Sequence, residues 1–516
     1  MTVQLVWFKK DLRTIDHRPL AAAARAGLVL CVYVLEPEQL RAEDADERHW
    51  GFLRRSLMQL DARLQRLGTR LVLLQGDLPG VFAWLHSKCG LARIWCHEET
   101  GNFLSYQRDR RVRAWCRANA IPIEEVPQSG VVRRLASRDG WSAIWRARMR
   151  EPIVEEPQSI RCGAAEFPGE LCGQSVVPQE LQPDAYWREG VDGLSGELPG
   201  FQEGGCDAGE RYLQTFLELR GADYRRAMSS PVTGEQGCSR LSPYLAFGNL
   251  SIRQVVQRSR ARLLQVREDL RGGVSVDESW TQSLASFESR LSWHCHFMQK
   301  LEDEPQLEFR NVNRAFDGLR ENEFREEWFR AWQDGQTGYP MVDACMRALR
   351  STGWINFRMR AMVMSFAAYH LWLHWRRPAL HLARMFTDYE PGIHYSQCQM
   401  QSGVTGINTI RIYSPAKQAR DQDPSGLFIR RWVPELDGVP DEFLAEPHRM
   451  SVFQQSLFGC RIGRDYPVPL VEHESAYRLA RDRIFAAVST SAARQAAAEV
   501  YERHGSRRRP LTDGNR

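Results

Sequence analysis

Residues 237–245 read Gly-Cys-Ser-Arg-Leu-Ser-Pro-Tyr-Leu, a block with the features of a helix start. Ser239 and Ser242 are residue types that commonly cap helices, and Pro243 fits a first helical turn. Gly248 can end the helix. Free backbone N–H groups and the helix dipole at such a start favour a bound anion. The block therefore predicts either an anion-binding helix or an ordinary capped one.

Further blocks follow in order along the chain. Residues 338–343 read Gly-Tyr-Pro-Met-Val-Asp, residues 353–360 read Gly-Trp-Ile-Asn-Phe-Arg-Met-Arg, and residues 411–415 read Arg-Ile-Tyr-Ser-Pro. The order and spacing of these blocks resemble the flavin domain of the cryptochrome/photolyase family. The resemblance spans roughly residues 2–508. It implies an FAD cofactor held in a folded conformation by an all-helical domain.

The first part of the chain has a different pattern, in which short apolar runs alternate with amphipathic stretches. The runs predict strands at residues 3–8, 28–35, 70–75, 93–97 and 121–126. The amphipathic stretches predict helices such as residues 48–67 and 103–120. This alternation is typical of an α/β domain with a doubly wound parallel sheet. No Gly-x-Gly-x-x-Gly block follows the first run, so a dinucleotide site of the usual kind is not expected.

The first predicted strand runs into residues 7–13, Trp-Phe-Lys-Lys-Asp-Leu-Arg, which resemble the opening of the family's antenna domain. A folate or a deazaflavin can bind there in the family as a second chromophore. This chain has His17 where many relatives have Asn, which weakens the expectation of an antenna. For Lys9 and Lys10 we favour a solvated charged loop at the strand end.

The chain is expected to divide into two domains, because 516 residues exceed the size at which a single core keeps growing. We expect an α/β parallel-sheet, antenna-type domain over residues 1–130 and an all-α FAD-binding domain over residues 206–505. Residues 131–205, rich in Pro, Gly, Ser and Glu, are expected to connect them. Residues 506–516 are expected to form a disordered tail.

The composition disfavours several classes of protein. No apolar run approaches the roughly 20 residues of a membrane span, and no cleavable signal is visible, so we expect a cytoplasmic location. The 12 cysteines include no Cys-x-x-Cys pair, which argues against a zinc ribbon or a disulfide framework. His294 and His296 flank a cysteine, but their side chains would converge poorly on a helix, and we predict no metal site. With a net charge of only +5, any basic face for DNA must be local.

The resemblance assigns the cofactor-binding residues. In the family, the block at residues 239–245 and an upstream tyrosine clasp the FAD diphosphate, and an acidic loop touches the ribose, the adenine and the isoalloxazine edge. Arg360 matches the arginine that pairs with the first acid of that loop, and a buried Asp388 without such a partner would be unfavourable. The predicted cofactor-binding residues are Tyr224, Cys238, Ser239, Arg240, Leu241, Ser242, His294, Phe357, Arg360, Asp388, Tyr389 and Glu390.

Electron transfer to the flavin is expected to take an unusual route. Trp375 matches the middle one of three tryptophans that carry electrons in familiar members. Asn322 stands at the distal position, and Cys398, or Ser396 under another alignment, stands at the proximal one. Light is therefore expected to reduce FAD through Trp375 with a substitute aromatic residue. The candidates are Trp328, Trp332, Trp372 and Tyr395.

His394 lies where the resemblance puts the residue that faces flavin N5. An imidazole has an unperturbed pKa near 6.5, so His394 is expected to donate or withhold a proton in the physiological range. The alternative is that a shorter loop before Gly403 displaces His394 into a structural role.

Lesion recognition is expected to involve Trp293, which matches a tryptophan that stacks on the lesion in cyclobutane-dimer photolyases. Those enzymes carry Glu where this chain has Arg290, and Phe357 and Ala361 replace two further residues beside the Arg-x-Arg pair. Enzymes for (6-4) photoproducts use a histidine in the segment that reads Ile-Asn-Phe at residues 355–357 here. This last departure disfavours the (6-4) class.

The resemblance implies two main functions. The leading one is blue-light-driven repair of pyrimidine dimers in DNA, in which reduced, excited FAD donates an electron to a flipped-out lesion. The alternative is a cryptochrome-type photoreceptor that signals through a partner without repair. A third class is a light-independent flavoprotein or nucleic-acid-binding module. For the leading function we expect damaged DNA as the partner, no membrane and a monomeric protein.

Overall fold

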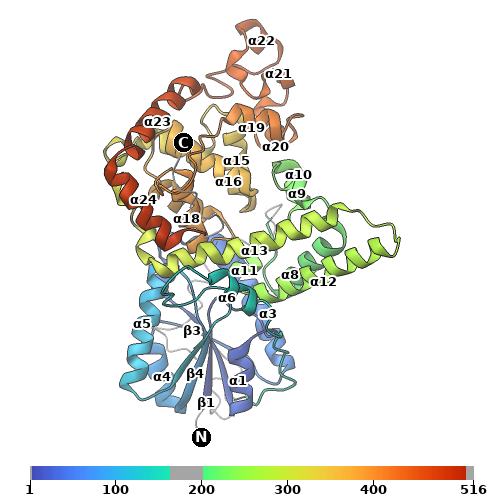
Figure 1. Ribbon diagram of the computed structural model, residues 1–516, viewed down its shortest axis with the longest axis vertical. Coiled ribbons are helices and arrows are strands. Elements are labelled where there is room, and N and C mark those ends of the chain that lie inside the picture. The colour runs from blue at the N-terminus through green and yellow to red at the C-terminus, as the bar shows by residue number, and fades with distance from the viewer. Residues whose placement is uncertain (1–2, 163–200, 507–516) are drawn as a thin grey trace.

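The computed structural model describes residues 3–162 and 201–506, which form an α/β part and a helical part stacked along the long axis of the molecule (Figure 1). Five parallel strands form one sheet in the order β3-β2-β1-β4-β5. The strands are β1 (Val3–Phe8), β2 (Val29–Leu35), β3 (Leu71–Gln75), β4 (Leu91–His97) and β5 (Ile123–Val126). All five predicted strands are confirmed, with ends within two residues of those expected.

Helices cover both faces of this sheet, because successive strand residues point to opposite sides. Trp7 packs toward α4 and α5, whereas Phe8 packs toward α1 and α3. The helices of this part are α1 (Arg18–Ala26), α2 (Pro37–Leu40), α3 (Glu47–Arg66), α4 (Gly80–Cys89) and α5 (Phe103–Ala118). The doubly wound α/β class is therefore confirmed. The carboxyl ends of the strands face the helical part (Figure 1).

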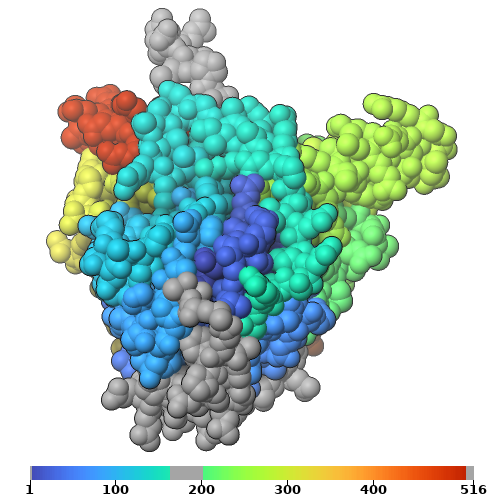
Figure 2. All heavy atoms as spheres, turned by 90° about the horizontal axis from the view of Figure 1, so that it is seen from below, coloured from blue at the N-terminus to red at the C-terminus, as the bar shows by residue number. Residues whose placement is uncertain are grey.

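The helical part contains no strand among residues 201–506, which confirms the predicted all-α class. Its longest helices, α12 and α13, form a pair that projects from the body (Figures 1 and 2). Its helices are α8 (Cys206–Thr215), α9 (Tyr224–Ala227), α10 (Pro231–Gly237), α11 (Ser242–Ala246), α12 (Ile252–Arg271), α13 (Ser279–Asp303), α14 (Glu326–Asp334), α15 (Pro340–Thr352), α16 (Phe357–Ser365), α17 (Arg376–Met385), α18 (Pro391–Gln401), α19 (Pro415–Gln422), α20 (Leu427–Trp432), α21 (Asp441–Leu444), α22 (Val452–Leu457), α23 (His473–Val488) and α24 (Ser491–His504).

The segment between the two parts contains a helix, α6 (Trp141–Arg148), which packs against the helical part. Trp141 and Trp145 are buried in the same apolar cluster as Phe216 and Tyr244. The rest of the expected connector, residues 163–200, and the expected tail from residue 507 lie outside the described residues. Within the described part of the chain, no helix combines the length and the apolar character needed to cross a bilayer.

Candidate functional site

A cavity of about 260 Å³ lies among α16, α17, α18 and the loop that precedes α18. Apolar side chains such as Met364, Leu382 and Ile393 form much of its wall. Distant blocks of sequence meet here because α18 packs against both α16 and α17. The predicted site residues that line the cavity are Ser242, Phe357, Arg360, Asp388, Tyr389, Glu390 and His394.

Arg360 and Asp388 form the ion pair predicted from the sequence. Arg360 donates from Nη1 to Asp388 Oδ1 over 2.9 Å and from Nη2 to Oδ2 over 2.8 Å. Its Nε donates to the Ile355 carbonyl oxygen over 2.9 Å. Burial alone would raise the pKa of Asp388, but the charge and hydrogen bonds of Arg360, with one more from Ser242, lower it below its usual value. Asp388 is therefore a fixed carboxylate on the cavity wall.

Glu390, the second acid of the loop, has a different environment. Its Oε2 lies 3.9 Å from Lys10 Nζ, and its Oε1 has no hydrogen-bond partner among the described residues. Burial raises the pKa of Glu390 to about 7, an effect that Lys10 opposes and Glu99 reinforces. Near neutral pH this side chain therefore exchanges between carboxylic acid and carboxylate.

The wall suits a flat aromatic ring system with a hydrogen-bonding edge. Glu390 Oε1 and Gln397 Oε1 are buried polar atoms that find no partner in the described part of the chain. A buried polar atom without a partner is unfavourable by about 1–3 kcal/mol. A flavin ring has apolar faces for the aliphatic wall and polar atoms along its edge for such groups. The residues present thus fit the FAD that the resemblance implies.

His394 lines this cavity from α18, and its ring is held in place. Its Nε2 lies 2.7 Å from the carbonyl oxygen of Ala379, an acceptor, so Nε2 carries a proton and donates it. Burial lowers the pKa of His394 to about 4, although the Ala379 carbonyl opposes the shift. The expectation that His394 titrates in the physiological range is therefore wrong, because withdrawal from water favours the neutral ring.

The helix in the block that begins at Gly237 lacks the expected N-terminal cap, whereas Gly248, with a φ of 68°, ends it as expected. Helix α11 spans five residues, Leu241 occupies its N-cap position, and no side chain caps it. Capping by Ser239 or Ser242 was therefore a wrong expectation. Arg240 has a φ of 59°, in the left-handed region, so the chain turns sharply just before the helix.

Several residues predicted to bind the cofactor do not line this cavity. Arg220 holds the turn by donating to the carbonyl oxygens of Cys238 and Ser239, over 2.6 and 3.3 Å. The guanidinium carbon of Arg240 lies 4.0 Å from the ring centroid of Trp354, which itself lines the cavity. Two further predicted residues, Tyr224 and Leu241, are buried in an apolar cluster. For the residues of this group, contact with FAD stays a prediction.

Trp375 is fully buried, and its Nε1 donates to Asn311 Oδ1 over 2.7 Å. Its ring centroid lies 6.4 Å from that of Tyr395, which lies 6.3 Å from that of Tyr389. Tyr389 lines the cavity and donates its hydroxyl to Asp44 Oδ2 over 2.6 Å. These three rings form a series between Trp375 and the cavity. Sequence reasoning did not single out Tyr389 for this role, although an aromatic residue inside the acidic loop was a visible signal.

The other aromatic candidates pack elsewhere. Trp332 contacts the rings of Phe329 and His381. Trp372 belongs to a separate cluster, where the guanidinium carbon of Arg320 lies 4.4 Å from its ring centroid. Of the expected substitutes, Tyr395 is the one that contacts the Trp375 ring among the described residues.

Trp293 and His294 lie outside the wall of the main cavity. The Trp293 ring packs on those of His296 and Phe297, each with centroids 5.5 Å apart. His294 lines a second, smaller cavity, where its Nδ1 has no partner within the described residues. Phe357, by contrast, lies at the edge of the main cavity, and 51% of its surface is exposed.

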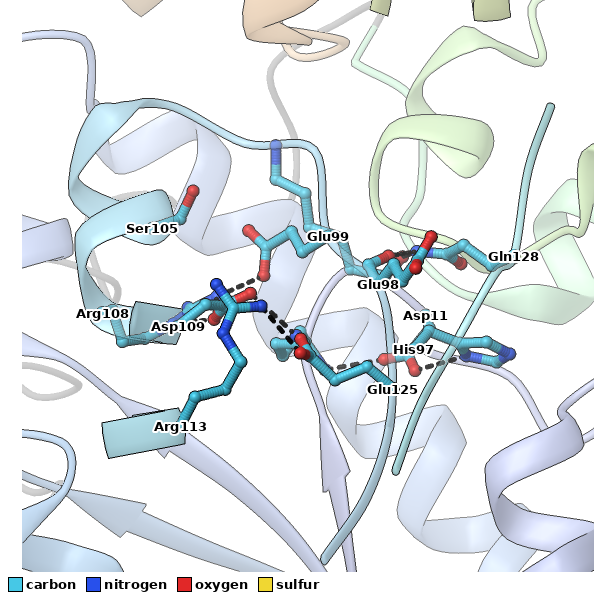
Figure 3. Close-up of polar contacts among 12 residues, drawn as sticks. Asp11, His97, Glu98, Glu99, Ser105, Arg108, Asp109, Arg113, Glu125 and Gln128 are labelled. Atoms are coloured by element: carbon cyan, nitrogen blue, oxygen red, sulfur yellow. Dashed lines mark hydrogen bonds and ion pairs between the residues drawn. The ribbon is translucent and has the colours of Figure 1, made fainter. Parts of the chain in front are cut away.

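The carboxyl edge of the sheet is filled by buried charges (Figure 3). Arg108 donates to Glu36 over 2.8 Å, to Glu99 over 2.6 Å and to Asp109 over 2.9 Å. Lys9 lies 3.3 Å from Asp109 and is almost fully buried, so the expected solvated loop is wrong for Lys9. It is buried because its charge is paired here and because its Nζ lies over an aromatic ring.

The cavities described at this edge are too small for an antenna chromophore, with volumes of about 40 and 10 Å³. Binding of a folate or a deazaflavin as an antenna stays a prediction. His17, the residue that departs from the family here, accepts a hydrogen bond from Leu20 N over 3.0 Å and caps α1.

Asp11, His17 and His97 bring three potential metal ligands together in the α/β part. Both imidazoles hydrogen-bond to the same oxygen, Asp11 Oδ2, from His17 Nε2 over 3.0 Å and from His97 Nδ1 over 2.8 Å. Because His17 Nδ1 already accepts from Leu20 N, its Nε2 must carry a proton and cannot ligate a metal in this state. The group therefore serves as a hydrogen-bonded core, of which Figure 3 shows Asp11 and His97.

Comparison with known proteins gives consistent results along most of the chain. Residues 4–138 match the DNA photolyase family, and residues 287–486 match the family described as the FAD binding domain of DNA photolyase. A deoxyribodipyrimidine photo-lyase from Synechococcus is 29% identical, over 91% of this chain and 93% of the relative. A cryptochrome DASH from Gloeobacter violaceus is 28% identical, over 91% and 93%. The crystal structure of a class III photolyase from Agrobacterium tumefaciens shares the fold, with a TM-score of 0.77 over 95% of this chain and 98% of that one at 24% identity.

Proposed function

Because the chain belongs to the cryptochrome/photolyase family and carries its FAD-binding domain, we propose that it repairs pyrimidine dimers in DNA under blue light. The observation that supports this proposal most directly is an exposed aromatic side chain at the edge of the cavity. Phe357 lines the cavity and is 51% exposed, so a planar base can reach the cofactor site past an aromatic ring. An exposed aromatic ring at such a place provides a stacking surface for a flipped-out base.

Two arginines lie close to Phe357, Arg290 in space and Arg358 as the next residue in the sequence. The guanidinium carbon of Arg290 lies 5.9 Å from the ring centroid of Phe357. Arg358 donates to Ser229 Oγ over 3.3 Å, and its Nε has no partner among the described residues. Neither arginine forms an ion pair with an acidic side chain in the described part of the chain. We expect both to contact the phosphates beside a lesion, Arg290 in exchange for its hydrogen bond with Tyr224.

The residues of the cavity would bind and orient the cofactor and exclude water from it. Bound FAD, when reduced and excited by light, supplies the electron that splits the dimer and receives it back. Asp388 and Arg360 fix the polar wall through two hydrogen bonds. Leu382 and Ile393 cover the apolar part of the cavity. We further propose that the protein is a monomer, that it is located in the cytoplasm and that its partner is damaged DNA.

A photoreceptor without repair activity is the second candidate. It is favoured by Trp293, which does not line the cavity, and by Arg290, which replaces the Glu of cyclobutane-dimer enzymes. A cryptochrome also stands among the relatives at 28% identity. A signalling partner would then take the place of damaged DNA.

Binding of damaged DNA tests the proposal. We expect the wild type to prefer an oligonucleotide that contains a pyrimidine dimer over the intact one. Phe357→Ala should reduce this preference by about 1–3 kcal/mol, the contribution of stacking on one base. Phe453, which is 75% exposed on α22, provides the control variant Phe453→Ala, which should retain the preference. Equal affinity of the wild type for damaged and intact DNA would favour the photoreceptor.

A further inference from the structure

Glu390 lines two cavities at once. One is the 260 Å³ cavity that fits the flavin ring. The other is a polar cavity of about 40 Å³ between the α/β and helical parts, lined also by Lys10, Glu98, Gln128 and His294. Since a water molecule needs about 10–15 Å³ of such space, the polar cavity has room for a few of them. Glu390 thus lies between a cavity with room for water and the cofactor site.

The two oxygens of Glu390 have unequal surroundings. Oε2 lies 3.9 Å from Lys10 Nζ, a distance too long for a direct hydrogen bond. Oε1 is buried and finds no partner in residues 3–162 and 201–506. Neither the acid nor the carboxylate is therefore held firmly by hydrogen bonds, and the side chain is free to exchange a proton.

Charged groups from both parts of the molecule face Glu390, among them Arg13, which lines the same polar cavity, and Glu98, whose pKa is also raised by burial. From the α/β part, Lys10 and Glu99 act on it in opposite directions. Glu98 and Gln128 line the polar cavity from the segments that follow β4 and β5 (Figure 3). From α13, His294 contributes a ring whose pKa is lowered by burial to about 4, so the ring is neutral near pH 7.

The groups on the flavin side of Glu390 are already engaged. Asp388 is paired with Arg360 through two hydrogen bonds, and its pKa is held below its usual value. His394 donates to the Ala379 carbonyl oxygen and is neutral near pH 7. Burial raises the pKa of Glu390 to about 7, so both its carboxylic acid and its carboxylate are populated at neutral pH.

We propose that Glu390 transfers protons between the polar cavity and the flavin ring in the adjoining cavity. When the ring has taken an electron from an aromatic side chain or from an added thiol, the O–H bond of Glu390 breaks and its proton passes to the ring. The resulting carboxylate faces the charge of Lys10. Water in the polar cavity then relays a proton from the solvent to Glu390, so that one proton is taken up for each one passed to the ring. This inference rests on the proposed binding of FAD but not on DNA repair.

The test is proton uptake by the FAD-loaded protein. Glu390→Gln keeps the shape of the side chain but cannot exchange a proton. We expect the variant to take up protons during photoreduction about 100-fold more slowly than the wild type, measured with a pH-indicator dye in weak buffer. The amount of bound FAD and its affinity in the dark are measured in parallel. In the wild type this dark affinity should change with pH near 7, and in Glu390→Gln that pH dependence should be lost.

Glu308 provides a matched control. It is also buried, with a pKa that burial raises to about 7, but it lines neither cavity. Glu308→Gln should therefore take up protons at the rate of the wild type. If Glu390→Gln binds no FAD, Glu390→Asp is measured instead, and slower uptake again supports the proposal. Uptake at the wild-type rate in the Glu390 variant overturns it, whether or not the protein repairs dimers.

Discussion

Asp388 and Arg360 neutralise each other on the wall of the FAD cavity, so replacing Asp388 with Ala leaves the arginine without its carboxylate. Breaking a buried ion pair lowers the free energy of unfolding by about 3–5 kcal/mol. We expect a loss at the lower end of this range because the Arg360 side chain is 26% exposed. The variant should lose FAD during gel filtration and unfold at a lower Tm. Flavin absorbance and thermal unfolding measure the two effects.

The matched control for this variant is Asp441→Ala, which breaks the exposed pair between Asp441 and Arg430 and should change the unfolding free energy by about 0–1 kcal/mol. Because the pKa of Asp388 is lowered in the folded protein, its contribution is complete above the unfolded carboxyl pKa of about 4. It disappears as the pH falls through the lower, folded value. Full retention of FAD and an unchanged Tm in the Asp388 variant would contradict the assigned role of this pair.

His394 should keep a neutral ring throughout the physiological range, since burial lowers its pKa to about 4. We therefore expect the pH profile of FAD photoreduction to be the same in His394→Asn and in the wild type between about pH 6 and 8. Absorbance kinetics, with the FAD content of both proteins matched, provide the measurement. A profile that changes on substitution means that the ring titrates once the cofactor is bound.

At the scale of elements, the acidic loop and α18 bring Tyr389 and Tyr395 into series with Trp375. Phe at any of these positions removes the indole or the phenol that electron transfer requires. We predict that Trp375→Phe and Tyr389→Phe each slow FAD photoreduction strongly, as followed by absorbance under blue light. The control is Trp332→Phe, because this buried ring packs on Phe329 instead. Wild-type kinetics in the Trp375 variant would show that the electron takes another route.

The elements differ in how well the sequence predicts them. The strands were predictable because each is a short apolar run bounded by polar turns, and the pairing of Asp388 with Arg360 followed from the unfavourable burial of a lone carboxylate. The turn at Arg240 could not be predicted from the sequence, since its positive φ depends on tertiary contacts such as the stacking of Arg240 on Trp354. The lowered pKa of His394 could not be predicted from the sequence either, because it depends on the burial of the imidazole ring in the folded protein.

At the scale of the whole molecule, net charge alone gives little attraction for DNA, so binding must depend on arginines near the cavity. We predict that affinity falls steeply with salt, because each neutralised phosphate releases a counterion. Arg358→Gln should reduce the slope of log affinity against log salt by about one. Arg111 pairs with Glu38 on the α/β part, so Arg111→Gln should leave the slope unchanged. Equal slopes for wild type and Arg358→Gln would exclude a phosphate contact at this residue.

The most direct measurement for the whole account is turnover of an oligonucleotide with a defined cyclobutane pyrimidine dimer, under blue light, after chemical reduction of the FAD. We predict that the dimer is converted to intact pyrimidines in the light and not in the dark. Asp388→Ala should lose this activity together with its FAD. Full FAD loading and light absorption in the wild type, without any conversion of the dimer, would contradict the account and indicate a photoreceptor.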